Sequence, residues 1–211
     1  MLMSIYDQIY AACQPYWHVR ANAIHIPVVY DFAQQLLAAH PQADPTIVLP
    51  AILMHDNGYA NVPEASLFQG LADAPTGFKP DITRLHEIEG VKIARSILAA
   101  LHYDPTKTEI ICMIIDGHDS RLEALSLEDA LVKDADKLWR FTSIGVRTSS
   151  PWMPMEPVAF LGYCVTKIER WFFTDVAKQM AHQLAAESAT SMIQGLQNRQ
   201  HACVTNNDEN I

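Results

Sequence analysis

The sequence has 211 residues, of which 49% are hydrophobic and 18% charged, and its formal net charge is -9. This composition is typical of one globular domain with a sizeable core, not of a disordered chain. The acidic balance argues against a nucleic-acid groove or an anionic membrane surface as partner, because both require clustered Lys and Arg. The four cysteines are scattered, the first residues lack a secretory-signal pattern and no apolar stretch is long enough to span a membrane, so we expect a cytoplasmic protein without disulfides.

Apolar residues at helical spacing predict a series of helices in the first half of the chain, and strand-like alternation is nearly absent. The pairs Asp44-Pro45 and Asp104-Pro105 mark helix starts, because aspartate caps free N–H groups and proline is tolerated in the first turn. Asp81 is expected to cap another helix. The predicted helices cover residues 5–13, 23–39, 44–55, 81–101 and 104–117. The predicted fold class is all-α.

A long irregular segment interrupts these helices. Asn57-Gly58 ends the third predicted helix, and the glycines and prolines of residues 59–80 predict a loop. Long loops beside ligand sites often act as lids, so Tyr59 and Phe68 are candidates for substrate contact.

The second half of the chain also predicts helices. Ser126 followed by Asp129 resembles a capping box at the start of a helix over residues 126–141. After a turn-rich segment at 148–157, a long helix or a broken pair of helices is expected over 158–198. The polar residues 200–211 are predicted to form a frayed tail.

Six histidine and aspartate residues recur in or beside the apolar helices. They are His25, His55, Asp56, His86, His118 and Asp136. His55 and Asp56 follow the apolar run 47–54, and burying a carboxylate costs several kcal/mol unless it is paired or bound to a metal ion. We therefore predict one site with two imidazole and two carboxylate ligands and with positions open for water and substrate. These ligands are His25, His55, Asp56 and Asp136.

Two roles are open for His86 and His118. They either hold a second ion with Asp56 as a bridge, or stay without metal and contact an anion. The structural alternative is a core histidine that donates to a backbone carbonyl. The site is therefore expected to hold one or two divalent ions per chain, and Mn, Fe, Zn, Co, Ni and Mg are all candidates.

At these residues the chain resembles the HD-domain superfamily of metal-dependent phosphohydrolases. The matching segments are Ala23-Ile24-His25-Ile26, Leu53-Met54-His55-Asp56-Asn57-Gly58, His86-Glu87-Ile88-Glu89-Gly90, Ile114-Ile115-Asp116-Gly117-His118 and Lys133-Asp134-Ala135-Asp136-Lys137-Leu138. The resemblance covers residues 7–140 and implies an HD-domain helical bundle with the metal site between its helices. It implies a single domain over residues 1–199, with accessory helices over 157–199 and a polar tail over 200–211. Asn57 departs from the family, in which an apolar residue often follows the His-Asp dyad.

The resemblance implies a metal-dependent phosphohydrolase that acts on a small phosphorylated molecule, with a nucleotide as the expected substrate. The metal ion would make hydroxide available at neutral pH, and Asp56 or Asp136 would orient the attacking water. His86 or His118 would hold the phosphate or protonate the leaving oxygen. The same six residues also resemble the ligand set of HD-fold mixed-valence di-iron oxygenases. A non-catalytic nucleotide-sensing module is a third alternative, which the complete ligand set disfavours.

Other residues near the predicted site have both functional and structural interpretations. Lys79, Arg84 and Lys137 are candidates for binding phosphate, although basic residues near helix ends are usually solvated. Asp129 and Asp134 are expected to be cap and surface charges.

The aromatic residues of the last third are expected in the core or on the surface of a homodimer. They are Trp139, Phe141, Trp152, Tyr163, Trp171, Phe172 and Phe173. The histidines outside the predicted site are expected to be structural or solvent-facing, namely His18, His40, His102, His182 and His201.

Overall fold

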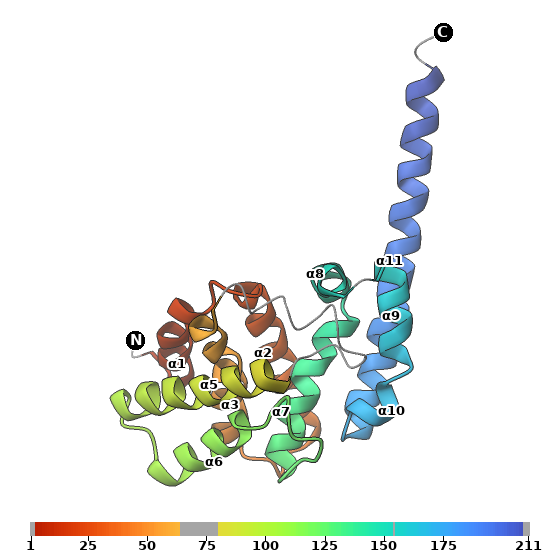
Figure 1. The fold of residues 1–211 in the computed structure, drawn as a ribbon. Helices are drawn as coiled ribbons and strands as arrows, with labels where there is room; N and C mark the ends of the chain where they lie inside the picture. Colours follow the sequence, from red (N-terminus) through yellow and green to blue (C-terminus); the bar gives the residue numbers. More distant parts are fainter. Residues whose placement is uncertain (1–2, 64–79, 154, 209–211) are drawn as a thin grey trace.

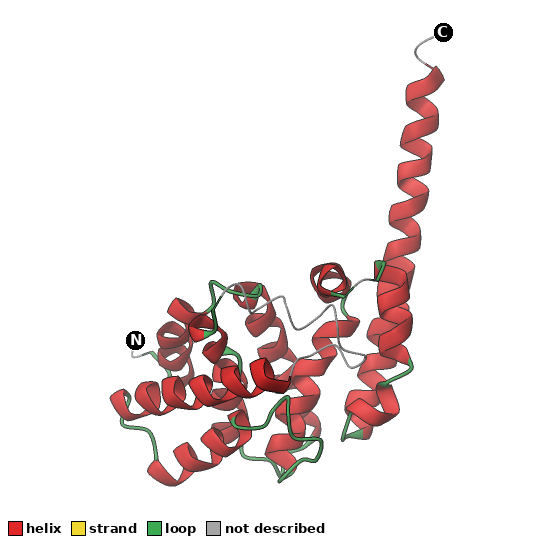
Figure 2. Cartoon of the chain, in the orientation of Figure 1, coloured by secondary structure: helices red, strands yellow, loops and turns green. Residues whose placement is uncertain are grey.

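The computed structural model describes residues 3–63, 80–153 and 155–208. Its elements within these ranges are α-helices and short 3-10 helices, and none of them is a strand (Figure 1 and Figure 2). The predicted all-α class is therefore confirmed. No helix in the described part of the chain is both long enough and apolar enough to cross a membrane.

Capping aspartates set the starts of helices in the first half of the chain. The elements are α1 (Ile5–Cys13), η1 (Gln14–Tyr16), α2 (Asn22–Ala39), α3 (Pro45–Met54), η2 (Asn57–Asn61), α5 (Pro80–Ala100) and α6 (Pro105–Ile115). The side chains of Asp44 and Asp104 each accept a backbone N–H in the first turn of α3 and α6, so both predicted Asp-Pro starts are confirmed. Because α5 begins at Pro80, Asp81 lies inside the helix and does not precede it as predicted.

The second half of the chain differs more from the prediction. Its elements are α7 (Leu127–Leu138), η3 (Trp139–Phe141), α8 (Ser143–Ser149), η4 (Ser150–Trp152), α9 (Pro157–Val165), α10 (Ile168–Trp171) and α11 (Asp175–Asp208). Helix α8 was not predicted, and the expected long helix or broken pair is three helices. The segment predicted to be a frayed tail continues as helix to Asp208, and α11 projects away from the body of the molecule (Figure 1).

Helix α3 is the centre of the core. Every residue from Ile47 to Met54 is buried, and the helix packs against α1, α2, α6 and α7. A helix that is apolar on all sides is stable only when it is enclosed, and each buried aliphatic side chain contributes roughly 1.5–3 kcal/mol. Whatever follows this helix therefore emerges inside the protein, and the next two residues are His55 and Asp56.

A close approach at Gly58 joins the end of α3 to α5. A Cβ atom on Gly58 would lie 1.8 Å from the backbone oxygen of His86 and 2.4 Å from the nitrogen of Gly90. Only glycine allows two backbones to come this close. The contact places η2 directly against α5, and so brings His86 beside the His55-Asp56 dyad.

Candidate metal centre

The structure brings the six predicted ligands to one point between helices α2, α3, α5, α6 and α7. They are His25 in the first turn of α2, His55 and Asp56 at the end of α3, His86 within α5, His118 in the turn after α6 and Asp136 within α7. All four histidines and Asp136 are buried, and Asp56 is largely enclosed. Residues spread over positions 25 to 136 of the chain thus share one interior cluster.

The first group of ligand atoms comes from His25, His55 and Asp56, whose ligand atoms all lie within 4.8 Å of one another. The Nε2 atoms of His25 and His55 are 3.3 Å apart, and Asp56 lies 3.7 Å and 3.6 Å from them. Asp136 approaches from α7, with Oδ1 3.2 Å from Nε2 of His25 and 3.6 Å from Nε2 of His55. With Asp136 added, the first group contains all four residues that were predicted to bind the first ion.

The second group shares Asp56 with the first and adds His86 and His118. The two Nε2 atoms of these histidines are 3.2 Å apart. Oδ1 of Asp56 lies 3.8 Å from Nε2 of His86 and 3.4 Å from Nε2 of His118. Asp56 therefore has carboxylate oxygens facing both groups, which is the position of a bridging ligand.

The tautomers of these histidines test whether the residues suit a metal ion. The Nδ1 atoms of His55, His86 and His118 each face a backbone carbonyl oxygen, to which only a protonated Nδ1 can donate. The acceptors are Ile52 at 2.8 Å, Ile82 at 3.4 Å and Ile115 at 3.0 Å. Each neutral ring then presents an Nε2 lone pair to the cluster. Two lone pairs about 3.2 Å apart repel unless a cation lies between them, and this spacing suits ligands that lie about 2.1 Å from one ion. The residues therefore fit a divalent metal ion.

The titration of the cluster supports the same conclusion. Burial raises the pKa of Asp56, but the imidazoles of His55 and His118 lower it more, so the carboxylate stays ionised. Burial and the neighbouring His118 lower the pKa of His86 to about 4. For His118, burial lowers the pKa, but Asp56 and Asp119 outweigh it and raise the pKa to about 9. The carboxylates of the cluster thus favour a positive charge beside these histidines.

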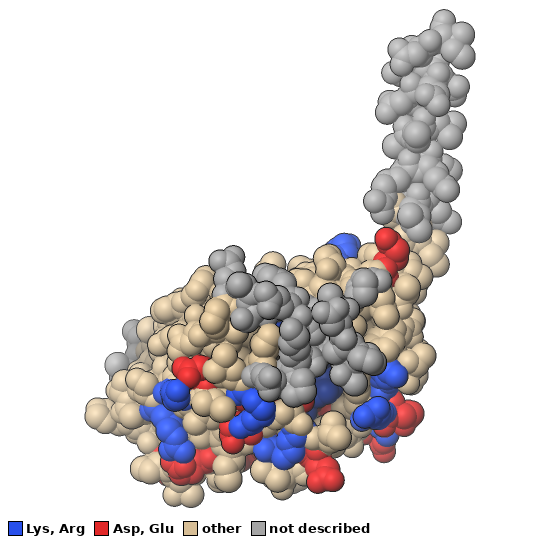
Figure 3. Space-filling view, in the orientation of Figure 1, with Lys and Arg blue, Asp and Glu red and all other residues tan. Residues whose placement is uncertain are grey.

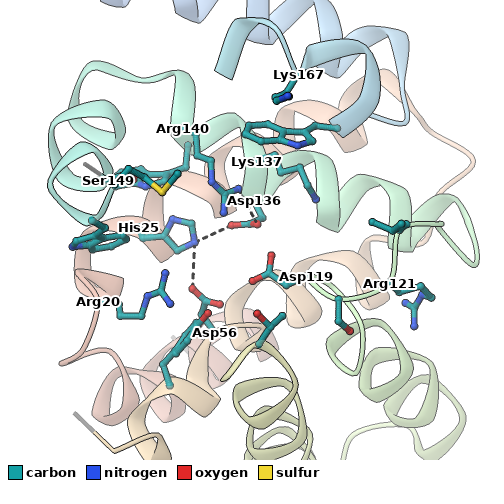
Figure 4. A pocket seen from close by; sticks show the side chains of 18 of the residues that line it. Arg20, His25, Asp56, Asp119, Arg121, Asp136, Lys137, Arg140, Ser149 and Lys167 are labelled. Carbon is teal, nitrogen blue, oxygen red and sulfur yellow. Dashed lines mark ion pairs between the residues drawn. The ribbon is translucent and has the colours of Figure 1, made fainter. Parts of the chain in front are cut away.

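The cluster opens into a cavity of about 500 Å³. Among the described residues, seven of the chain's 15 basic side chains line this cavity, but three of its 24 acidic side chains do so. The basic residues are Arg20, Arg84, Arg121, Lys137, Arg140, Lys167 and Arg170. The acidic residues are Asp56, Asp119 and Asp136, which turn toward one another at the centre of the site (Figure 4). A protein of net charge -9 thus gathers a large share of its cations around one carboxylate–histidine cluster.

Comparison with protein families matches the HD domain model to residues 23–140, which is more than half of the chain. The chain belongs to the HD domain family. The family consists generally of metal-dependent phosphohydrolases, and the resemblance seen in the sequence is therefore confirmed. No curated protein and no solved structure gives a significant match.

Asp119 is a candidate site residue of this HD domain that the sequence analysis missed. Its Oδ2 lies 3.8 Å from Nε2 of His86 and 3.9 Å from Nε2 of His118. The carboxylate is largely enclosed by the cavity. Asp119 directly follows His118, so the second group gains a second carboxylate from the same turn. The Gly-His-Asp order of residues 117–119 was the signal that could have revealed it.

Two buried side chains of opposite charge hold the turn that carries His118 and Asp119. Glu87 is fully buried and accepts the backbone N–H groups of Asp119 at 3.0 Å and Ser120 at 2.8 Å. Lys133 is 1% exposed and donates to three backbone carbonyl oxygens of the same turn. These are the oxygens of Gly117 at 2.6 Å, His118 at 3.4 Å and Arg121 at 2.7 Å. The backbone of this turn is therefore fixed from both sides, and we call Glu87 and Lys133 the turn clamp.

Arg20 also lines the cavity and was not predicted. Its guanidinium lies over the ring of Tyr59, 4.1 Å from the centroid, and 5.0 Å from the centroid of Trp152. Arg20 and Ala21 both have left-handed backbones, with φ of 51° and 59°. Such residues cost of order 1–3 kcal/mol each, and this strain is found most often at functional sites. An isolated arginine before the matched segment gave no signal in the sequence.

The other predicted substrate-binding residues lie in different places. Arg84 and Lys137 line the cavity, although Arg84 also pairs with Glu87 and Asp116. Tyr59 lines it as well, but it is 2% exposed and its ring stacks on that of His86 at 3.9 Å. Lys79, Phe68 and most of the predicted lid fall within residues 64–79, outside the described part of the chain.

Asp129 and Asp134 are not the surface charges that were expected, because both are fully buried. Asp129 accepts the Leu125 N–H and pairs with Arg121. Asp134 accepts two backbone N–H groups and the hydroxyl of Thr174 between α10 and α11. This contact ends α10 and begins α11, which explains why one predicted long helix is broken there.

The aromatic residues of the last third divide between the core and the cavity. Phe141 and Phe172 are in the core as expected, and their rings lie 5.6 Å apart. The others line the cavity, and the expectation of a core or dimer position was incomplete for them, except that Trp139 is also a buried member of the core as expected. They are Trp139, Trp152, Tyr163, Trp171 and Phe173. Sequence spacing could not separate the two sets, because they lie on short helices or, for Phe172 and Phe173, between α10 and α11.

Proposed function

We propose that this HD domain is a phosphohydrolase with a two-ion centre, and that it acts on a small phosphorylated molecule of the nucleotide class. The observation that carries the proposal is the pair of His–Asp groups sharing Asp56 at the base of a cation-lined cavity. Two ions bridged by a carboxylate are a common arrangement for hydrolysis of phosphate esters. The basic lining supports an anionic substrate, because the cations concentrate there against the net charge of the chain.

The residues of the cavity suggest how the work is divided. Divalent ions, when bound, supply a water of lowered pKa and neutralise charge on phosphoryl oxygens. Asp56, Asp119 and Asp136 hold the ions and orient the attacking water. Arg140, whose guanidinium lies 3.8 Å from Asp136 and reaches toward the carboxylates, binds the phosphoryl oxygens (Figure 4).

The second group of ligand atoms supports one of the two roles that the sequence left open for His86 and His118. Both Nε2 atoms face Asp56 and Asp119, and both Nδ1 atoms face carbonyl oxygens. A general acid that protonates the leaving oxygen would have to face the open cavity, and neither ring lines it. We therefore assign both histidines as ligands of the second ion. Convergence of all six residues also favours the alternative function, an HD-fold mixed-valence di-iron oxygenase, because that chemistry needs the same ligands.

Phosphate release and metal content test the proposal together. The protein is loaded separately with Mn²⁺, Fe²⁺, Co²⁺, Ni²⁺, Zn²⁺ or Mg²⁺ and assayed against a panel of nucleotides and sugar phosphates. We expect phosphate release and two ions per chain. His86→Ala should lose one ion and lower turnover at least about a hundredfold. His182→Ala, which changes an exposed histidine outside the cavity lining, is the matched control. Two bound irons with a near-infrared intervalence band, and no phosphate from any substrate, would favour the oxygenase.

A further inference from the structure

Three basic side chains in the cavity have no carboxylate partner within the part of the chain that the structure describes. Arg20 aside, four of the described basic side chains have no carboxylate partner among the described residues, namely Lys137, Arg147, Lys167 and Arg170, and Lys137 donates to the backbone oxygen of Lys133 at 3.4 Å. The others pair with a carboxylate or, for Lys133, donate to carbonyl oxygens. Three of these four line the cavity, and Arg147 is exposed outside its lining. Like charges gathered in one concave site repel one another and focus a positive potential there. The arrangement therefore favours binding of an anion in that part of the cavity.

The three cations lie on the side formed largely by the C-terminal helices. Lys167 immediately precedes α10, Arg170 lies within it, and Lys137 lies on α7 one residue after Asp136. Figure 4 shows Lys167 on the opposite side of the cavity from Asp56. An anion bound beside Asp56 is consequently not the group that Lys167 is placed to hold, and Lys137 lies between Lys167 and the carboxylates (Figure 4).

Aromatic contacts and a buried carboxylate fix this side of the cavity relative to the metal centre. The Lys167 ammonium lies 4.9 Å from the ring centroid of Tyr163, and the guanidinium of Arg140 lies 5.8 Å from that of Trp171. Asp134 accepts the N–H of Phe173 at 2.8 Å, and it lies on α7 with Asp136. One helix thus carries both a residue of the metal cluster and the carboxylate that anchors the α10–α11 turn.

We propose that Lys137, Lys167 and Arg170 form a distal anion subsite that selects substrates with a second phosphate group. This inference rests on the proposed function, because it takes the metal centre as the place where the first phosphoryl group reacts. The substrate class is then a diphosphate or bisphosphate and not a simple monoester. The C-terminal helices that supply Lys167 and Arg170 lie beyond residues 23–140, so this specificity is a property of the accessory part of the chain.

Binding of orthophosphate and pyrophosphate to metal-loaded protein, measured by calorimetry after free ions are removed, tests the subsite. The variants are Lys167→Gln, Arg170→Gln and the double variant, and Arg147→Gln is the matched control. We expect the double variant to weaken pyrophosphate binding about ten- to a hundredfold, the range for losing charge-assisted hydrogen bonds. Each single variant should lose part of this affinity, which preserves the test if the double variant does not fold. Orthophosphate binding should not change in any variant.

Unchanged pyrophosphate affinity, or an equal loss for both anions, would overturn the subsite. The activity panel separates this failure from failure of the proposed function. If wild-type protein releases no phosphate but Lys167→Gln still weakens pyrophosphate selectively, the subsite stands and the hydrolase assignment falls. If the enzyme cleaves monophosphates and diphosphates with equal kcat/KM and the variants change neither, the hydrolase stands and the subsite falls.

Discussion

Glu87→Gln tests whether the turn clamp positions the second group of ligands. The carboxylate of Glu87 accepts from Asp119 and Ser120 backbone N–H groups, from the Ser120 hydroxyl at 2.7 Å and from Arg84 at 2.5 Å. Glutamine has nearly the same shape, but it has no charge and presents an amide NH₂ group in place of one oxygen. If that NH₂ replaces Oε2, it meets the Arg84 guanidinium, which has only donors.

The expected loss follows from these contacts. A hydrogen bond to a charged group contributes about 1.5–3 kcal/mol, and at least two of them lose their charge here. The Arg84 contact counts for less, because that side chain is 40% exposed and can turn to water. We therefore expect Glu87→Gln to lower the free energy of unfolding by about 2–3 kcal/mol. The turn should also loosen, and affinity for the second metal ion should fall.

Urea unfolding in the presence of a chelator measures the free energy of unfolding without any contribution from bound metal. Metal titration of the folded variant measures its affinity for the second ion. Glu89→Gln is the matched control, since Glu89 lies on the same helix and pairs with the exposed Lys92. Its metal affinity should equal that of the wild type. Lys133→Met should have the same two effects as Glu87→Gln, and the double variant should lose less than the sum because both residues hold one turn. Wild-type stability together with two tightly held ions in Glu87→Gln would refute the role of the clamp.

Two further predictions concern the first metal group and a surface pair. His55→Ala and Asp56→Ala should lose stoichiometric metal but keep an α-helical circular dichroism spectrum, whereas retained metal in both variants would contradict a shared site. At Asp44, burial raises the pKa, but hydrogen bonds from Thr46 and Lys107 outweigh it and lower the pKa overall. The stability that Asp44 contributes is therefore present above pH 4 or so and is lost as pH falls through the lowered pKa. Asparagine is also a good N-cap, so Asp44→Asn removes the charge but keeps the cap. Thermal melts of this variant should show reduced stability at pH 7 but converge with the wild type near pH 3. A constant difference across this range would disprove that ionisation of Asp44 contributes to stability.

The sequence by itself determined the helices of the first half of the chain and the order of the ligands. Periodic apolar residues and the caps at Asp44 and Asp104 act within one or two turns, so they can be recognised without knowledge of distant neighbours. The His55-Asp56 dyad was also recognisable, because it ends an apolar run that has to be buried.

Tertiary structure alone decided how these residues work together. Three features join residues 12 to 39 positions apart. They are the close approach of His86 and His118, the turn clamp, and the hydrogen bond from the Phe173 N–H to Asp134. Such contacts have no local pattern, because a buried carboxylate that holds a distant turn has the same sequence as a solvated one on a helix surface. The cations of the cavity were hidden for the same reason: whether a lysine has a carboxylate partner depends on which helices pack beside it.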